Sequence, residues 1–346
     1  MGYRIGFDIG STTIKAVVLD ENNQICYKSY ERHKAQVRQK ALDKLVELKK
    51  YTKEPFKFAI SGSGALGLCE QGELPFVQEV FASATGVSKL YPETDCAIEL
   101  GGEDAKILFF QGSVEQRMNS TCAGGTGAFI DQMSTLLNMS LEEMNEASLN
   151  YHRLYPIASR CGVFAKTDIQ PLINQGVDKC DLCASIFQAV VDQTITSLAQ
   201  GRKIEGNILF LGGPLYFMSG LRKRFVETLK LSDVQVNCPE TAINFVALGT
   251  AICADQEYTY DELYKALEDL VHTPAKLTES KPLFESEEDY QKFIGRHKSH
   301  DAKYAELKDY AGKAYLIPVQ RPQNSFYSMK TMRFYMILIH RIREIH

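Results

Sequence analysis

Two cysteines of this chain stand in stretches of small residues, where neither a core thiol nor a disulfide is expected. Cys122 lies in the sequence STCAGGTG and Cys161 in SRCGVFAK, and an apolar, helix-like segment follows each of them. The backbone dipole and the free N–H groups at a helix N-terminus favour a thiolate. Both cysteines are therefore candidate metal ligands, with two buried thiols as the alternative.

The number of candidate thiolates restricts the kind of metal group that they could bind. Iron–sulfur clusters prefer four thiolates, and Cys122 and Cys161 supply two from one chain. Two chains related by a two-fold axis would supply four. Cys180 and Cys183 also have metal-ligand spacing, but they stand in a helical run with no second pair nearby. We predict that this second pair consists of structural thiols.

Three glycine-rich turns, each after a strand-like segment, occur in order along the chain. The first can direct backbone N–H and hydroxyl groups at phosphate oxygens, and its carboxylate can hold Mg²⁺ through water. The second could place a γ-phosphate and the attacking water, and the third suits a flat adenine. The candidate residues are Asp8, Gly10, Ser11, Thr12, Thr13 and Lys15 in the first turn, Glu99, Gly101 and Gly102 in the second, and Gly212 and Gly213 in the third.

The order of the three turns resembles the actin-like ATPase superfamily, which includes sugar kinases, heat-shock-70 chaperones and actin. Asp8 and residues 10–13 match its first phosphate motif, residues 99–102 its second, and residues 212–213 its adenosine motif. The resemblance implies an α/β, ribonuclease H-like fold with two lobes and a nucleotide cleft between them. It also implies catalytic roles for Asp8 and Glu99. A Walker A sequence is missing, which excludes the P-loop class.

The two cysteine motifs narrow the resemblance to the BadF/BadG/BcrA/BcrD-type ATPases, which include activators of 2-hydroxyacyl-CoA dehydratases and the ATPase subunits of benzoyl-CoA reductase. The resemblance covers residues 1–254. It implies hydrolysis of ATP with Mg²⁺, and a homodimer that holds one [4Fe–4S] cluster through Cys122 and Cys161 of both chains. It further implies low-potential electron transfer from a ferredoxin or flavodoxin donor to a dehydratase or reductase partner.

Two other function classes remain open from the sequence. A small-molecule kinase of the same superfamily, acting on a sugar or an acid, would carry a substrate-base aspartate in place of the paired cysteines. A nucleotide-sensing scaffold would bind ATP without turnover. Visible absorbance of the protein purified without oxygen would separate the cluster-bearing class from both.

Two positions depart from the pattern of the resembled family. Glu99 stands where Asp is usual, and its longer side chain would shift the contact to Mg²⁺ or water. Ala82 and Ser83 stand where the family often carries Cys-His. We therefore predict no site in the segment from residue 79 to residue 86.

Strand and helix patterns alternate along the first 254 residues, which favours an α/β fold. The order divides this module into lobes at about residues 1–95 and 96–254. The expected elements are three strands within 3–30, a helix over 34–50, a strand over 57–61, a second α/β block from 95, helices from 128 to 202, a strand over 207–211 and a helix over 242–254.

Bulk composition restricts the partners and the compartment. A net charge of −4 gives no basic footprint for nucleic acid. The longest apolar run of the tail, residues 334–339, is too short for a membrane span. Nine cysteines without a signal-peptide pattern are typical of a reducing cytoplasm. We therefore expect a cytoplasmic protein that binds neither nucleic acid nor membrane.

The last ninety or so residues change character. We predict a charged helical connector over residues 255–315 and a tail over 316–346 without a clear period. Read one base earlier through allowed codons, this tail can repeat the chain's own start, 11–15 and 20–30, without a gap. The hypothesis is a frameshifted piece of a longer tandem protein, whose second ATPase module would pair with the first. The piece itself would either homodimerise or lose its cluster and aggregate.

Overall fold

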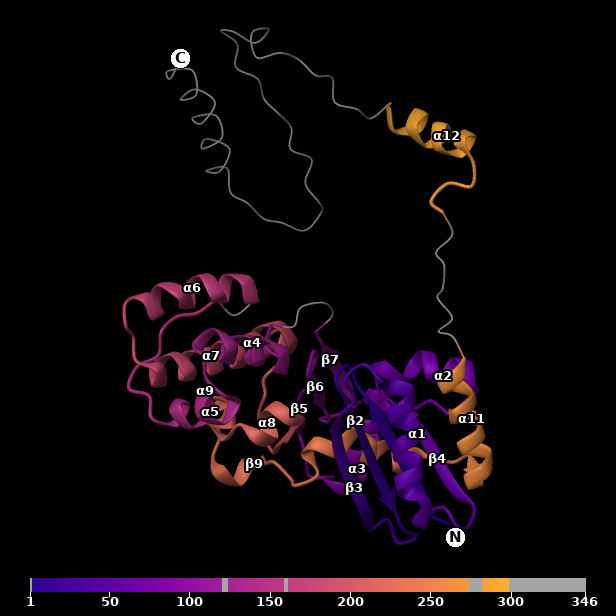
Figure 1. Cartoon of the computed structure of the whole chain (residues 1–346). Helices are drawn as coiled ribbons and strands as arrows, with labels where there is room; N and C mark the ends of the chain where they lie inside the picture. The colour runs from indigo at the N-terminus through magenta and orange to yellow at the C-terminus, as the bar shows by residue number, and fades with distance from the viewer. Residues whose placement is uncertain (1, 120–123, 159–160, 274–281, 299–346) are drawn as a thin grey trace. The chain divides into compact units, whose positions relative to one another are not determined.

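The computed structural model describes residues 2–119, 124–158, 161–273 and 282–298. The chain divides into two units, Met1–Ala275 and Lys276–His346. The first unit contains two five-stranded sheets with helices around them (Figure 1). This arrangement confirms the predicted α/β fold. In the second unit the structure describes helix α12 (Glu287–Lys298), none of whose residues is buried.

The first sheet has the strand order β10-β4-β1-β2-β3. Strands β1, β2 and β3 form an antiparallel meander, as predicted for the first thirty residues, and β4 lies parallel to β1. Strand β10 pairs antiparallel with β4 and closes this edge. The bounds are β1 Arg4–Ile9, β2 Thr13–Leu19, β3 Ile25–Arg32, β4 Phe56–Ser61 and β10 Glu257–Tyr258.

The second sheet repeats this plan in the order β7-β6-β5-β8-β9. Strands β5, β6 and β7 form another antiparallel meander, and β8 lies parallel to β5. Here the outermost strand, β9, is parallel to β8. The bounds are β5 Cys96–Leu100, β6 Ala105–Phe109, β7 Glu115–Met118, β8 Ile208–Leu211 and β9 Val236–Asn237.

Helices cover both outer faces of the two sheets and fill the layer between them (Figure 1). Because successive side chains of a strand point to opposite faces of the sheet, an apolar face of the sheet packs against each helical layer. The first sheet's outer layer holds α1 (Val37–Glu47), α2 (Leu66–Gly72) and α11 (Tyr260–His272), and the middle layer holds α3 (Glu79–Leu90) and α10 (Phe245–Cys253). The second sheet's outer layer holds α4 (Gly127–Leu137), α5 (Leu141–Leu149), α6 (Gly162–Asn174), α7 (Lys179–Thr194), α8 (Gly213–Phe217) and α9 (Ser219–Leu229).

The middle layer depends on close backbone contact. A Cβ on Gly6 of β1 would collide with the backbone of Ala247 and Ala251 in α10. A Cβ on Gly249 would likewise collide with the Ala82 backbone in α3. Glycine at these positions lets α10 approach β1 and α3 closely. Helix α10, which the sequence order places in the second lobe, therefore packs against the first sheet.

The predicted connector begins later than expected. Residues 257–258 form β10, and Leu263, Leu267 and Leu270 of α11 are buried in the core of the first sheet. These residues belong to the first lobe, so the predicted boundary at residue 255 was wrong. Within the remainder of the predicted connector, the structure describes helix α12. The tail over 316–346 lies outside the described residues.

One helical stretch, Lys179–Ala199, is long and apolar enough to cross a membrane by length and composition. In this structure 72% of its apolar window is buried. The core of the second lobe covers it, as expected for the central helix of a folded lobe. Polar residues interrupt the apolar positions of this helix, so no continuous apolar run in the sequence indicates it.

Candidate active site

A cleft of about 880 Å³ lies between the two sheets' glycine turns. All three predicted turns contribute to its lining, and every predicted phosphate and adenosine residue takes part. These residues are Asp8, Gly10, Ser11, Thr12, Thr13, Lys15, Glu99, Gly101, Gly102, Gly212 and Gly213. The structure therefore brings together groups that are spread over more than two hundred positions in the sequence.

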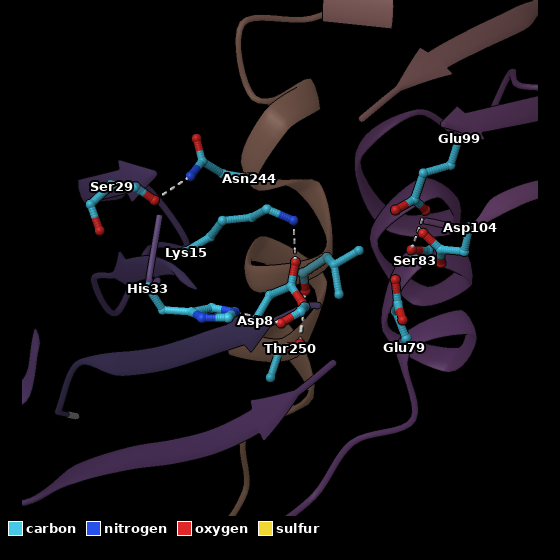
Figure 2. A network of polar contacts seen from close by, with 12 residues as sticks. Asp8, Lys15, Ser29, His33, Glu79, Ser83, Glu99, Asp104, Asn244 and Thr250 are labelled. Carbon is cyan, nitrogen blue, oxygen red and sulfur yellow. Dashed lines mark hydrogen bonds and ion pairs between the residues drawn. The ribbon is translucent and has the colours of Figure 1, made fainter. Parts of the chain in front are cut away.

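Asp8 and Lys15 form the charged pair of the first hairpin. They face each other across β1 and β2, and Lys15 Nζ lies 2.7 Å from Asp8 Oδ2 (Figure 2). Burial would lower the pKa of Lys15, but the negative charge of Asp8, with smaller contributions from Glu99 and Tyr30, holds that pKa above its usual value. Lys15 is therefore a cation at the cleft, and the buried carboxyl group of Asp8 lies beside it.

Glu99 and Lys106 occupy the corresponding positions of the second hairpin, across β5 and β6. Lys106 Nζ lies 3.5 Å from Glu99 Oε1 and 3.0 Å from Asp104 Oδ2, and it also pairs with Glu79. Burial alone would lower the pKa of Lys106, whose side chain is 1% exposed. The carboxylates of Glu99, Glu79 and Asp104 reverse that effect and raise it.

Glu79, which no sequence motif indicated, is a further carboxylate of the cleft. It is the first residue of α3 and pairs with Lys106 of the second hairpin. Burial raises its pKa to about 7; Lys106 opposes this rise, and the negative charges of Glu99, Asp8 and Asp104 add to it. Three carboxyl groups around one ammonium group do not ionise independently, and burial together with the neighbouring negative charges favours the protonated form of Glu79.

Ser83 and Glu99, which both depart from the pattern of the resembled family, contact each other. Ser83 Oγ donates a hydrogen bond of 3.2 Å to Glu99 Oε2, and both side chains are buried (Figure 2). A hydroxyl in α3 thus holds one oxygen of Glu99 while Lys106 holds the other. Glu79 and Ser83, from the segment for which the sequence predicted no site, thus both contact side chains of the second hairpin.

The first two glycine turns lie against each other across the cleft. A Cβ on Gly102 would stand 3.1 Å from Thr12 Oγ1. The second turn also holds the start of α4, since the Gly127 N–H donates to Gly101 O at 3.0 Å and the Ala128 N–H to Gly102 O at 2.7 Å. A phosphate group between these turns would face backbone groups from both lobes and from the α4 N-terminus.

The third turn begins at a glycine that no other residue could replace without strain. Gly212 follows β8 with φ of 87°, and a Cβ there would collide with the Leu100 carbonyl of β5. Helix α8 starts directly after it, with Pro214 in its first turn. Across the cleft mouth, the ring of Phe217 lies edge-on to that of Tyr30 at 6.1 Å. This turn forms a flat, partly aromatic wall.

The two cysteine-bearing segments lead into helices that meet. Cys161 is the N-cap of α6 and is partly exposed. A Cβ on Gly162, the first residue of α6, would lie 3.5 Å from Phe129 of α4. Cys122 lies outside the described residues, two positions before Gly124, on the segment that leads into α4. Cys161 therefore stands at the start of a helix, as the sequence predicted.

Within the described ranges, no group of three His, Cys, Asp or Glu side chains is arranged to hold a metal ion. Cys183 is fully buried in α7, and burial raises the pKa of its thiol to about 12. A protonated core thiol of this kind agrees with the structural role predicted for it.

Comparison with known proteins now assigns the family. Residues 5–254 match the BadF/BadG/BcrA/BcrD ATPase family. The chain belongs to this family. It is similar to the activator of lactoyl-CoA dehydratase from Anaerotignum propionicum, with 28% identity over 258 residues that cover 73% of this chain and 97% of the relative.

Solved structures of two activating proteins share the fold of this ATPase-family chain. One is component A of (R)-2-hydroxyglutaryl-CoA dehydratase from Acidaminococcus fermentans, with a TM-score of 0.65 and 24% identity, covering 78% of this chain and 100% of that one. The other is the activator of 2-hydroxyisocaproyl-CoA dehydratase from Clostridium difficile with bound ADPNP. The match has a TM-score of 0.64 and 25% identity, and it covers 77% of this chain and 97% of that one. The likeness confirms the actin-like ATPase fold.

Proposed function

We propose that this family member is an ATP-hydrolysing iron–sulfur activator that passes a low-potential electron to a 2-hydroxyacyl-CoA dehydratase or a benzoyl-CoA-reductase-like enzyme. One structural observation carries the proposal. Helix α4 is hydrogen-bonded at its start to Gly101 and Gly102 of the phosphate turn, and its Phe129 lies beside the first residue of the Cys161 helix. The nucleotide site and the cysteine segments thus share one helix.

This shared helix gives ATP hydrolysis a route to the cysteines. A phosphate between the two turns would pull on the backbone of residues 101–102, and the two hydrogen bonds would transmit that pull to α4. Movement of α4 would then shift the start of α6 and Cys161. Closure of two lobes around a nucleotide is a known way to drive such rigid-body shifts.

The residues of the cleft divide the hydrolytic work. Asp8 would hold Mg²⁺ through water, and Lys15, with the turn over residues 10–13, would bind the phosphate oxygens. Glu99, held by Lys106 and Ser83, would orient the attacking water. The turn at Gly212 and Gly213 would receive the adenosine.

Cys122 and Cys161 would hold a [4Fe–4S] cluster together with the same two cysteines of a second copy, or with a second module of a tandem parent. When bound, such a cluster supplies one-electron transfer at low potential. The exposed Val163 and Phe164, 68% and 64% exposed, border Cys161 and would become buried in that contact. A ferredoxin or flavodoxin in the cytoplasm would be the electron donor.

The test is purification without oxygen, followed by absorbance and iron analysis. We expect a brown protein with about two irons per chain, because one four-iron cluster would serve two chains. Cys122→Ser and Cys161→Ser should each remove the colour. Cys180→Ser is the matched control, and it should keep the colour because it alters a cysteine outside both segments.

Two outcomes would contradict this proposal. Iron retained at the wild-type level in both serine variants would remove the cluster assignment. A colourless wild-type protein that phosphorylates a sugar or an acid in the presence of ATP would establish the small-molecule kinase instead. Hydrolysis of ATP alone does not separate these cases, so iron content is measured first.

A further inference from the structure

The chain makes an unusual turn directly after β3. Lys34 and Ala35 have φ of 49° and 62°, the left-handed region that side chains with a Cβ rarely adopt. The Gln36 N–H donates to His33 O at 2.8 Å and closes this turn. Such a mirror-image turn usually requires Gly or Asn at its centre. Two ordinary residues in this conformation indicate that the surroundings impose it.

His33, the first residue of this turn, is buried with 4% exposure and grips the first phosphate turn. Its Nδ1 accepts from the Ala35 N–H at 3.1 Å, so the ring proton is on Nε2. That Nε2–H donates to Gly10 O at 3.0 Å, as Figure 2 shows for the ring beside Asp8. The His33 backbone N–H donates to Thr12 O at 3.2 Å.

His33 thus donates hydrogen bonds to two carbonyl oxygens of the first phosphate turn, those of Gly10 and Thr12. A carbonyl pointing into the cleft would repel a phosphate, whereas N–H and hydroxyl groups attract it. Among the described residues, Ser11 makes no hydrogen bond and Thr12 only accepts the one from His33. Their N–H and hydroxyl groups are therefore available at the cleft that both residues line.

The second hairpin has a similar support from the residue that follows its third strand. Asn119 comes directly after β7, and its Oδ1 accepts from the Ala105 N–H at 2.7 Å. In each meander, a polar side chain after the third strand makes a hydrogen bond near the turn between the first two strands, to Ala105 at the start of β6 in the second hairpin and to Gly10 in the first. The histidine version differs because its bond reaches a carbonyl inside the glycine turn.

We propose that His33 is a positioning residue that holds the first turn in the form that binds the terminal phosphates of a nucleoside triphosphate. The ring keeps Gly10 O turned away from the cleft, and the left-handed turn at residues 34–35 keeps the ring in place. The inference rests on the proposed nucleotide binding. It states that His33 contributes to the binding of the terminal phosphates and not to the binding of the adenosine.

Two substitutions of His33 test the two hydrogen bonds of its ring separately. In His33→Gln the amide nitrogen can reach the place of Nε2 and still donate to Gly10 O. In His33→Asn the shorter side chain reaches only the place of Nδ1, so it can accept from Ala35 but cannot reach Gly10. Calorimetry measures the affinity of each variant for two probes, Mg²⁺–ADPNP and AMP. Of these two, AMP lacks the terminal phosphates.

We expect His33→Asn to weaken ADPNP binding about tenfold, as for loss of one hydrogen bond, and to leave AMP binding unchanged. His33→Gln should stay within about threefold of the wild type for both probes. If the Asn variant does not fold, His33→Ala with added imidazole provides the second measurement. Imidazole in the vacated space should restore ADPNP affinity without changing AMP affinity.

The possible failures are distinguishable. A wild-type protein that binds neither probe overturns the proposed function together with this inference. Wild-type binding with an unaffected Asn variant overturns the role of His33 alone. An equal loss of ADPNP and AMP affinity in both variants would also overturn it, because a merely structural residue would act on the whole cleft.

Discussion

The two lobes carry the same charged hairpin, and they use it differently. In each, a carboxylate at the end of the first strand faces a lysine across the second strand, Asp8 with Lys15 and Glu99 with Lys106. A glycine turn joins the two strands in both cases. The local geometry is therefore the same on both sides of the cleft, and the difference lies in the neighbours of each lysine.

Lys15 has one carboxylate partner and lines the cleft, with 18% of its side chain exposed. Lys106 has three carboxylate partners and is buried. An ammonium group with one partner keeps N–H donors for a ligand, whereas one with three partners has used them. The comparison shows that a cleft lysine can be predicted from spacing alone, but its role depends on residues from other elements.

The largest expected effect is on stability and comes from Lys106. Lys106→Met should lower the free energy of unfolding by about 3–5 kcal/mol, because the buried Glu99 and the partly buried Glu79 and Asp104 lose their cation. Lys15→Met should lower it less, since one carboxylate is affected, but should weaken ADPNP binding more. Urea unfolding and ADPNP titration of both variants measure this contrast. Equal stability losses would show that the two lysines have equivalent roles.

The next effect is on catalysis. Asp8→Asn and Glu99→Gln should each slow ATP hydrolysis about a hundredfold, since each removes a charge that acts on the reacting phosphate or water. ADPNP binding should fall less, because the turn at residues 212–213 is unchanged. Single-turnover hydrolysis and ADPNP titration measure the two quantities. Wild-type rates in both variants would remove the catalytic assignment.

A smaller effect is the pH dependence of stability from Glu79. Its pKa in the folded protein, about 7, lies above the usual 4.5, so the folded state holds a proton that the unfolded chain releases. Stability from this group is full below about pH 4.5 and is lost as the pH rises toward 7, by up to about 1–2 kcal/mol.

Glu79→Gln should flatten this part of the curve of unfolding free energy against pH. The matched control is Glu103→Gln, an exposed carboxylate of the same cleft, which should leave the slope unchanged. Urea unfolding at several pH values between 4.5 and 8 is the measurement. An unchanged slope in the Glu79→Gln variant would show that Glu79 is ionised throughout this range.

The smallest effect concerns Ser83 and Glu99. Ser83→Ala should cost about 0.5–1.5 kcal/mol of stability through the lost hydrogen bond. Glu99→Asp should withdraw the carboxylate from Ser83, so the double variant should lose less than the sum of the two single changes. A double-mutant cycle by urea unfolding measures the coupling. Additive losses would show that the 3.2 Å contact contributes no energy.

Local patterns in the sequence were sufficient for much of the fold and of the cleft. Strand, glycine turn and strand are consecutive in both hairpins, so Asp8, Lys15 and Glu99 could be placed from spacing. The order of the three turns then indicated the superfamily. The actin-like fold confirmed that prediction, and Cys161 was found at a helix start as expected.

Residues that act over long distances could not be found in this way. Glu79 reaches Lys106 only because α3 packs between the sheets, and nothing in its own neighbours indicates this contact. His33 was missed because its left-handed turn uses Lys and Ala rather than Gly or Asn. Helix α11 was missed as part of the core because an amphipathic pattern fits a connector equally well.

The return of the chain to the first sheet has a consequence for folding. All strands of the second sheet come from residues 96–237, one continuous stretch, whereas the first sheet receives β10, and the cover of α11, from beyond residue 256. During synthesis the second lobe can fold as soon as its stretch has emerged. The first lobe must close a much longer loop, which slows its completion. Until then, β4 remains an open edge strand, which another chain can pair with.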